Sequence, residues 1–279
     1  MADITAIILT GNEEKNIEEC ISSIKNIVQR IVVVDSGSRD RTVEIARAMG
    51  AEILVHEFSP FYQARQFIYA LETITIDTKW ILKFDADERL TEESSAELER
   101  LCAENADTDV NGIELRFEVS FMGKKLRHGG IYPFRKLVCF KNGAAYMEDR
   151  EMDEQIVLKC GRAICAKCDS LHHDYKDLSA WIAKHNDYSS REATAFLKHD
   201  GNEAAPSGKA AKVRRFIKYK VYYKLPSGFR AWAYYMYRYI IRGGFLDGKA
   251  GKRFAFLQAY WYRFLVDAKI DENRMNKSN

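Results

Sequence analysis

The chain lacks any apolar stretch near the roughly 20 residues that a membrane-spanning helix needs. No basic leader precedes the first apolar run, and no internal repeat or low-complexity block is evident. We therefore expect a soluble, cytoplasmic protein. Its 279 residues suffice for one large domain or for a domain with an appendage.

Acidic residues are absent between residues 204 and 246, where ten lysines and arginines occur. The remainder carries 33 basic against 40 acidic residues, so an acidic body is joined to a basic segment. Interleaved tyrosine, tryptophan and phenylalanine suit the headgroup level of an anionic membrane. We expect residues 209–242 to contact such a surface, although a helical hairpin packed on the catalytic domain would show the same composition. No nucleic-acid module is recognisable, so no nucleic acid partner is expected.

Six cysteines in a chain of this size need not form disulfides, and a reducing compartment would keep them as thiols. Cys160, Cys165, Cys168 and His172 have a spacing that could ligate zinc. The alternative is a strand pair in which the cysteines serve as small apolar residues.

Short apolar runs alternate with amphipathic stretches over the first hundred residues. The predicted strands are 4–9, 31–34, 53–55 and 80–84, and the predicted helices are 16–27, 42–49 and 61–71. This alternation favours a parallel sheet with right-handed crossovers. Strands 112–119 and 137–140 follow without long helices between them, so we expect the sheet to become mixed before a helix at 178–197.

The predicted fold class is α/β, with a mixed Rossmann-like central sheet flanked by helices and a C-terminal basic aromatic helical extension. Residues 1–200 would form the main domain and residues 201–279 the extension. Residues 198–209 contain glycine, proline and serine and are the best candidate for a linker.

Two carboxylates, Asp85 and Asp87, follow directly on the strand predicted at residues 80–84. In an open α/β sheet the ligand crevice lies beyond the carboxyl ends of the strands. Mg²⁺ and Mn²⁺ prefer oxygen ligands, and Mg²⁺ commonly takes one or two carboxylates together with substrate phosphates. The pair suits a divalent cation held against a diphosphate, but taken alone it more often marks a solvated acidic turn, so the metal interpretation depends on its context.

Three strand-end motifs occur in order: Thr10-Gly11-Asn12-Glu13, Asp35-Ser36-Gly37-Ser38 and Asp85-Ala86-Asp87-Glu88. Together they resemble the family 2 glycosyltransferases of the GT-A fold, strongly over residues 4–90 and more loosely to residue 197. With residues 244–248 added, the chain is most similar to bacterial transferases that build lipopolysaccharide cores or other surface glycans.

The resemblance implies a metal-dependent inverting transfer of a sugar from a nucleoside diphosphate donor, UDP-linked, to a hydroxyl of a lipid-linked or lipopolysaccharide glycan. The cofactor would be Mn²⁺ or Mg²⁺, and the enzyme would work in the cytoplasm or on the cytoplasmic face of the inner membrane. A sugar nucleotidyltransferase is the enzymatic alternative, but it would need a glycine-rich basic loop where residues 10–14 are acidic. A catalytically silent membrane-surface scaffold is the other alternative, and it would lack the metal-binding acid or the base.

The resemblance also implies roles for individual side chains. Asp87 would bind the metal, with Asp85 and His172 as further candidates. The nucleotide would be bound by Thr10, Asn12, Glu13, Asp35, Arg65 and Asp85, and the acceptor side would be lined by Arg127, His128 and Tyr132. Asp35 would alternatively serve only as a helix cap or Asx-turn residue. The base would be Asp153 or Glu154, between which the pattern does not decide, and a solvated acidic loop is the alternative for each.

Overall fold

The computed structural model describes residues 2–57, 63–149, 154–198 and 216–276, and the chain divides into two compact units. The first unit comprises Met1–Ser120 and Pro133–Tyr175, and the second comprises Phe121–Tyr132 and Lys176–Asn279. The boundary expected at residue 200, the linker at 198–209 beyond Lys198 and residues 209–215 of the basic segment lie outside the described residues.

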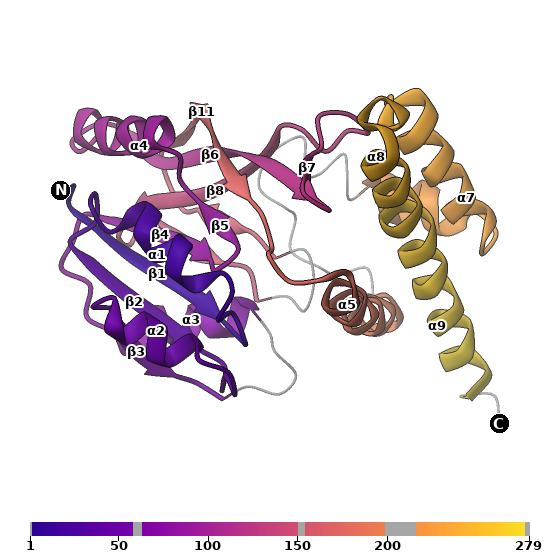
Figure 1. Ribbon diagram of the computed structural model, residues 1–279, viewed down its shortest axis with the longest axis horizontal. Helices are drawn as coiled ribbons and strands as arrows, with labels where there is room; N and C mark the ends of the chain where they lie inside the picture. The colour runs from indigo at the N-terminus through magenta and orange to yellow at the C-terminus, as the bar shows by residue number, and fades with distance from the viewer. Residues whose placement is uncertain (1, 58–62, 150–153, 199–215, 277–279) are drawn as a thin grey trace. The chain divides into compact units, whose positions relative to one another are not determined.

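Four parallel strands form one half of the main sheet in the first unit (Figure 1). They are β1 (Ile4–Thr10), β2 (Arg30–Asp35), β3 (Glu52–Val55) and β4 (Trp80–Asp85). β1 is central, with β2 and β4 as parallel neighbours, and all of its residues are buried. Burial on both faces explains why the sequence shows continuous apolar runs here rather than alternation. The four predicted strands are confirmed.

Helices cover both faces of this half of the sheet. Ala6 and Ile8 of β1 belong to the core that includes buried residues of α1 (Ile17–Ile24), α2 (Thr42–Ala48) and α4 (Glu92–Glu104). The alternate residues Ile7 and Leu9 belong to the opposite core with α3 (Gln63–Thr73). Successive side chains of a strand point to opposite faces of the sheet, so alternate residues of β1 pack into different cores.

The other half of the sheet is mixed, as predicted. The strand order is β3-β2-β1-β4-β8-β6-β11-β5. β8 (Phe134–Lys141) runs antiparallel to both β4 and β6 (Val110–Phe121), while β11 (Arg162–His172) runs parallel to β6 and antiparallel to β5 (Glu88–Arg89). β9 (Ala145–Met147) and β10 (Ile156–Leu158) form a separate two-stranded sheet that contributes to the α3 core.

β11 and α4 were not predicted from the sequence. β11 carries Cys165 and Cys168 among lysine and aspartate, so it lacks the apolar run of the parallel strands. Among the described residues, no group of three or more histidines, cysteines, aspartates or glutamates could hold a metal ion. Cys165, Cys168 and His172 lie on β11, and the exposed Cys160 lies in the turn before it.

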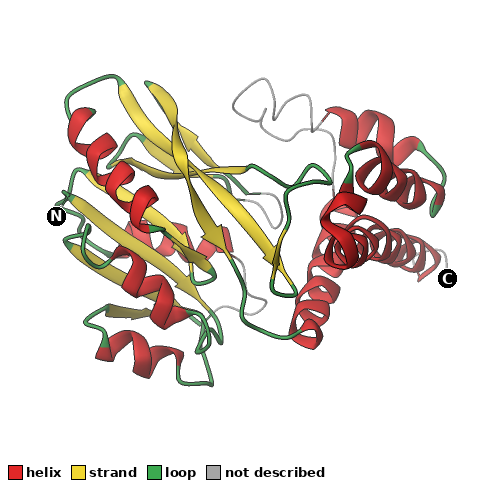
Figure 2. Ribbon diagram, turned by 45° about the horizontal axis from the view of Figure 1, so that its top comes forward, coloured by secondary structure: helices red, strands yellow, loops and turns green. Residues whose placement is uncertain are grey.

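The second unit is helical apart from the short strand β7 (Lys124–Lys125), as Figure 2 shows. Pro226, Ser227 and Gly228 separate two helical segments, and Gly243, with a φ of 70°, ends the second. None of the helices in the described part of the chain combines the length and apolarity that crossing a membrane requires. The elements are α5 (Leu178–Lys198), η1 (Ile217–Val221), η2 (Tyr222–Lys224), α7 (Phe229–Met236), η3 (Tyr237–Ile241), η4 (Gly244–Asp247), α8 (Gly248–Phe254), η5 (Ala255–Trp261) and α9 (Tyr262–Asn276).

Two arginines of this unit are buried with carboxylates. Arg230 forms an ion pair with Asp267 at 2.6 Å, and Arg263 forms one with Glu192 at 2.7 Å. Tyr262 donates a further hydrogen bond to Glu192 at 2.7 Å. Part of the basic aromatic composition therefore forms contacts within the helical unit itself.

His185 on α5 gives this unit a dependence on pH. Its ring stacks on Trp181 with centroids 3.5 Å apart, and its Nδ1 lies 2.8 Å from the Trp181 carbonyl oxygen. Burial, reinforced by the charge of Lys184, lowers the pKa of His185 to about 4 against the opposing hydrogen bonds from Trp181 and Gln258. The folded protein thus holds this imidazole neutral.

We predict that stability falls as the pH drops from 6.5 to 4, because the unfolded chain binds a proton there and the folded chain does not. The contribution amounts to at most about 3 kcal/mol, from 1.36 kcal/mol per pKa unit. Urea unfolding of wild type and His185→Gln, followed by tryptophan fluorescence at pH 7, 5.5 and 4.5, measures it. The variant should lose less stability on acidification, and identical losses in the two proteins would contradict the prediction.

Candidate active site

The carboxyl ends of β1, β2 and β4 lie at one edge of the first unit's sheet. In the parallel register Thr10 is the partner of Asp35, and Leu9 is the partner of Asp85. Because the strands are parallel, the residues that follow them come to the same edge from three separate parts of the chain. Ligands of open α/β sheets bind at this edge.

Asp35 organises the loop that follows β2. Its Oδ1 accepts a hydrogen bond from Thr10 Oγ1 at 3.0 Å, and its Oδ2 accepts from the backbone N–H groups of Gly37 and Ser38 at 2.9 and 2.7 Å. The side chain is buried. These are the contacts of an Asx-turn residue, so Asp35 shapes the loop at the edge where a nucleotide would bind.

The loop after β1 is joined to the loop after β2. The Asn12 side chain accepts a hydrogen bond from the Arg39 N–H at 2.9 Å, and the Asn12 N–H donates to Ser38 Oγ at 2.8 Å. The Glu13 N–H donates to Thr42 Oγ1 at 2.7 Å. Asn12 has a positive φ of 57°, a conformation that asparagine tolerates better than most residues. The two predicted nucleotide-binding loops therefore form one hydrogen-bonded unit.

Asp85 lies between two lysine ammonium groups. Lys83 Nζ is 2.7 Å from its Oδ1, and Lys136 Nζ is 2.5 Å from its Oδ2. Lys136 also contacts Glu88 Oε1 at 2.8 Å, and the Asp85 N–H donates to the other Glu88 oxygen at 2.9 Å. The four side chains, which we call the β4 charge cluster, hold two carboxylates and two ammonium groups at the end of β4.

The charges of the β4 charge cluster set its protonation. Burial by itself would raise the pKa of Asp85, but Lys136 and Lys83 outweigh burial and hold that pKa well below its usual range. Burial and the neighbouring Asp85 raise the pKa of Glu88. Burial would lower the pKa of Lys136, but Asp85 and Glu88 raise it. Asp85 and Lys136 are therefore a fixed anion and a fixed cation at neutral pH.

Asp87 lies next to His172, which comes from the far end of β11. His172 is the strand partner of Glu88 in the β11–β5 pairing, and its Nε2 lies 3.5 Å from Asp87 Oδ2. The Asp87 carbonyl also accepts the N–H of His173 at 2.9 Å. The structure thus brings the sequence-predicted pair Asp87 and His172 together, with a carboxylate oxygen and an imidazole nitrogen able to share a cation.

Of the two candidates for the base, Glu154 is described and Asp153 lies outside the described residues. Burial raises the pKa of Glu154, and its charged neighbours are Lys83, Asp85 and Lys136. Glu154 therefore approaches the β4 charge cluster, and it is a better proton acceptor than an exposed glutamate.

Arg65 on α3 engages a neighbouring acid. Its Nε donates to Asp149 Oδ1 at 2.7 Å, and its terminal nitrogen lies 2.6 Å from Asp149 Oδ2, a bidentate contact. Both side chains are about half exposed. The guanidinium is therefore partly open to solvent at the edge of the acidic segment.

The predicted acceptor-side residues belong to the second unit. Asp247 Oδ2 accepts the backbone N–H groups of Arg127 and His128 at 3.1 and 2.9 Å, while Asp247 Oδ1 lies 2.7 Å from His128 Nδ1. The Arg127 guanidinium stacks over the Tyr132 ring at 4.7 Å. Asp247 is buried and thereby fixes the loop and the orientation of the imidazole.

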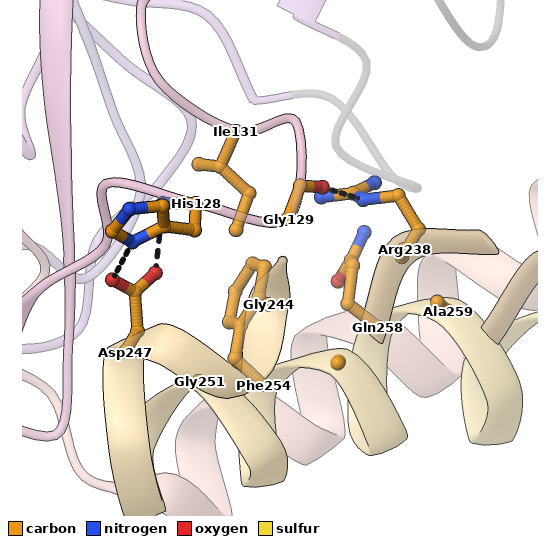
Figure 3. A pocket seen from close by; sticks show the side chains of 11 residues that line it. His128, Gly129, Ile131, Arg238, Gly244, Asp247, Gly251, Phe254, Gln258 and Ala259 are labelled. Atoms are coloured by element: carbon orange, nitrogen blue, oxygen red, sulfur yellow. Dashed lines mark hydrogen bonds and ion pairs between the residues drawn. The ribbon is translucent and has the colours of Figure 1, made fainter. Parts of the chain in front are cut away.

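A small pocket adjoins this pair, and Figure 3 shows His128 and Asp247 at one side of it and Arg238 at the other. Arg238 donates to the Gly129 carbonyl oxygen. A Cβ at Gly251 would clash with the Gly244 carbonyl oxygen, at 2.3 Å, so the close approach of these two segments requires glycine. In the 244–248 stretch that the sequence singled out, a Cβ at Gly244 would lie 2.9 Å from the Arg238 carbonyl oxygen, and Gly248 has a φ of 63°, so both positions favour glycine.

A family model described as Glycosyl transferase family 2 matches residues 5–157, more than half of the chain. The chain belongs to this family. The match covers the strand-end loops, Asp87, the β4 charge cluster and Glu154, whereas His172 and Asp247 lie beyond it. The protein is a glycosyltransferase.

Relatives of this glycosyltransferase carry the same description. An uncharacterized glycosyltransferase of Rickettsia felis is 27% identical over 290 residues, covering 100% of this chain and 93% of the relative. Another from Rickettsia bellii is 42% identical over 100 residues, covering 36% of this chain and 33% of the relative.

Among solved structures, the mannosyltransferase PcManGT of Pyrobaculum calidifontis superposes with a TM-score of 0.59 at 17% identity, covering 98% of this chain and 88% of that chain. The likeness shows the fold, and the predicted GT-A architecture of the glycosyltransferase is confirmed.

The sequence assigned no site role to Lys83 or Lys136, and it marked the 244–248 stretch without assigning a role to Asp247. Lys83 carries a signal that could have been read, since it is a lysine within an otherwise apolar strand directly before the acids. Lys136 reaches Asp85 only because β8 pairs antiparallel with β4, and Asp247 reaches His128 from a distant helix. No local pattern encodes either contact.

We predict that Lys136→Met destabilises the glycosyltransferase by about 3–5 kcal/mol, because it leaves a buried carboxylate without its counter-ion. Guanidinium unfolding measures the change. Arg135→Met, which alters the neighbouring exposed residue of β8, should stay within about 0.5 kcal/mol of wild type. Equal stability of the two variants would mean that the charge of Lys136 does not stabilise the carboxylates of Asp85 and Glu88.

Proposed function

We propose that this enzyme transfers a sugar, with inversion, from a nucleoside diphosphate sugar to a hydroxyl of a bacterial lipid-linked or lipopolysaccharide glycan. The observation that carries the proposal is the convergence of Asp87, His172 and the β4 charge cluster beside the joined loops of Asn12 and Asp35. The donor is expected to be UDP-linked. PcManGT is described in complex with GDP-Man and Mn²⁺, so guanine donors belong in the same test.

The residues present fit Mn²⁺ or Mg²⁺. Asp87 and His172 supply two ligand atoms, and Mg²⁺ is commonly held by only one or two carboxylates together with substrate phosphates and water. Asp85 is engaged by Lys83 and Lys136, so we assign it to orienting the ribose side rather than to the metal. Bound there, the cation would neutralise charge on the departing diphosphate.

The other side chains have roles that follow from their contacts. The joined loops bearing Thr10, Asn12 and Glu13, shaped by Asp35, would line the nucleotide. Arg65 would reach a base edge or phosphate through its guanidinium fork. Arg127, His128 and Tyr132 would face the acceptor, with the His128 ring oriented by Asp247.

Glu154 is the base of the proposed reaction. The acceptor oxygen bonds to the anomeric carbon while that carbon's bond to the diphosphate breaks, and the hydroxyl proton passes to Glu154. The electron pair of the broken bond leaves with the nucleoside diphosphate, so no covalent sugar intermediate is needed. Because the acceptor is lipid-linked, the reaction would take place at the cytoplasmic face of the inner membrane.

We predict that Asp87→Asn weakens Mn²⁺-dependent binding of UDP about tenfold or more, because an anionic ligand is lost. Calorimetric titration of UDP with and without Mn²⁺ measures binding. Hydrolysis of a panel of UDP- and GDP-sugars shows whether the donor carries uracil or guanine. Asp107→Asn, at an exposed carboxylate that pairs with Lys79, is the control and should bind as wild type. If Asp87→Asn binds UDP as tightly as wild type in the presence of Mn²⁺, Asp87 is not a metal ligand.

For Glu154→Gln we expect kcat to fall about 10²–10⁴-fold while donor binding is retained, because only the proton acceptor is lost. Steady-state kinetics and UDP titration separate the two effects. Glu148→Gln, a half-buried acid of the same segment, should keep most of its activity. If Asp153→Asn is inactive and Glu154→Gln is not, Asp153 is the base.

A further inference from the structure

Aromatic side chains form a continuous surface row on the C-terminal helices of the second unit. Along α7 and η3 the row contains Phe229, Trp232, Tyr235 and Tyr239, and Phe229 and Trp232 have ring centroids 5.8 Å apart. Tyr235 and Tyr239 stack at 5.4 Å. Phe245 follows, 6.2 Å from Tyr239.

A second line of rings runs along η5 and α9 beside the first. Phe256 and Tyr260 are 5.5 Å apart, and Tyr260 and Phe264 are 5.9 Å apart. Tyr235 lies 6.3 Å from both Phe256 and Tyr260, which joins the two lines. The helices that carry them pack against each other, α7 against η5, as Figures 1 and 2 allow the reader to follow. We call these rings the aromatic face.

The aromatic face is open rather than part of a core. Five of its side chains are each about half exposed: Phe229 52%, Trp232 50%, Phe245 48%, Phe256 48% and Phe264 47%. The nearby Ile241 and Leu246 are exposed at 74% and 59%. Contiguous exposed apolar surface of this kind marks an interaction site.

Residues 216–266, which carry the aromatic face, have charges of almost one sign. Between residues 216 and 266 the only acidic residue is Asp247, which is buried against His128. Two arginines of this stretch are paired with carboxylates: Arg230, which is buried, and Arg263, whose side chain is 24% exposed. The exposed charges that remain are basic: Lys220, Lys224, Arg242, Lys249, Lys252 and Arg253.

We propose that the aromatic face rests on the headgroup layer of an anionic phospholipid bilayer, with its basic residues on the lipid phosphates. Tryptophan and tyrosine favour this layer because their rings have an apolar body and a polar edge. No helix among the described residues could cross the bilayer, so the face lies on the membrane rather than through it. Two copies meeting through this face would bring the same cations together, which disfavours self-association.

This proposal rests on the proposed function, because membrane contact would bring the enzyme to a lipid-linked acceptor. It differs from the surface expected at residues 209–242, because it extends through Phe264 and its centre is the pair of helical lines. Vesicle binding needs neither donor nor acceptor. The membrane proposal can therefore fail while sugar transfer is confirmed, and sugar transfer can fail while vesicle binding is confirmed.

The test is cosedimentation of the full-length protein with unilamellar vesicles of phosphatidylcholine alone or with phosphatidylglycerol added. We expect binding to the anionic vesicles, weakened in high salt. Phe256→Ala/Phe264→Ala should bind roughly tenfold more weakly, because two rings no longer enter the interface. Tyr146→Ala/Met275→Ala, which removes two exposed side chains outside the aromatic face (46% and 65% exposed), should bind as wild type. Circular dichroism and thermal unfolding confirm that both variants fold.

Three results would overturn the proposal: absence of binding to anionic vesicles, equal binding to neutral and anionic vesicles, and equal binding by the two double variants. Sedimentation velocity tests the alternative that a second copy of the chain binds the aromatic face. A wild-type dimer that Phe256→Ala/Phe264→Ala dissociates, without vesicle binding, would assign the face to a second copy. Hydrolysis of a soluble nucleoside diphosphate sugar should be the same in all three proteins, and its absence in all would count against the proposed function instead.

Discussion

The site depends on the compensation of buried carboxylates by Lys83 and Lys136. Taking a charged carboxylate out of water costs several kcal/mol unless a counter-ion is held close to it with good geometry. Asp85 and Glu88 are buried at the end of β4, and the two ammonium groups lie within hydrogen-bonding distance of them. This compensation lets an acidic motif sit inside a sheet edge rather than in a solvated turn.

The same lysines place two carboxylates in different states. Asp85 is held as an anion, whereas burial raises the pKa of Glu154, which shares those charged neighbours. Pairs of acids whose environments move their pKa values apart commonly divide the tasks of binding and proton transfer. A positioning role for Asp85 and a basic role for Glu154 are consistent with this division in a glycosyltransferase of family 2.

The helical unit uses its basic aromatic composition in two ways. Arg230 and Arg263 form buried ion pairs with Asp267 and Glu192, and Tyr262 completes one of them. Other side chains of the same helices stay exposed, among them Phe229, Trp232 and Phe264. The interior contacts and the proposed membrane surface therefore use different side chains.

Local patterns were sufficient to predict the parallel half of the sheet, three of its helices (α1, α2 and α3, but not α4) and the edge at which Thr10, Asp35 and Asp85 meet. Strands buried on both faces leave continuous apolar runs, and the polar residues that follow parallel strands must gather at one edge. Only the tertiary structure brought Lys136 to Asp85, His172 to Asp87 and Asp247 to His128. Each of these contacts depends on antiparallel strand pairing or helix packing between distant segments, and such pairing is decided by the energy of the whole core rather than by any stretch of sequence.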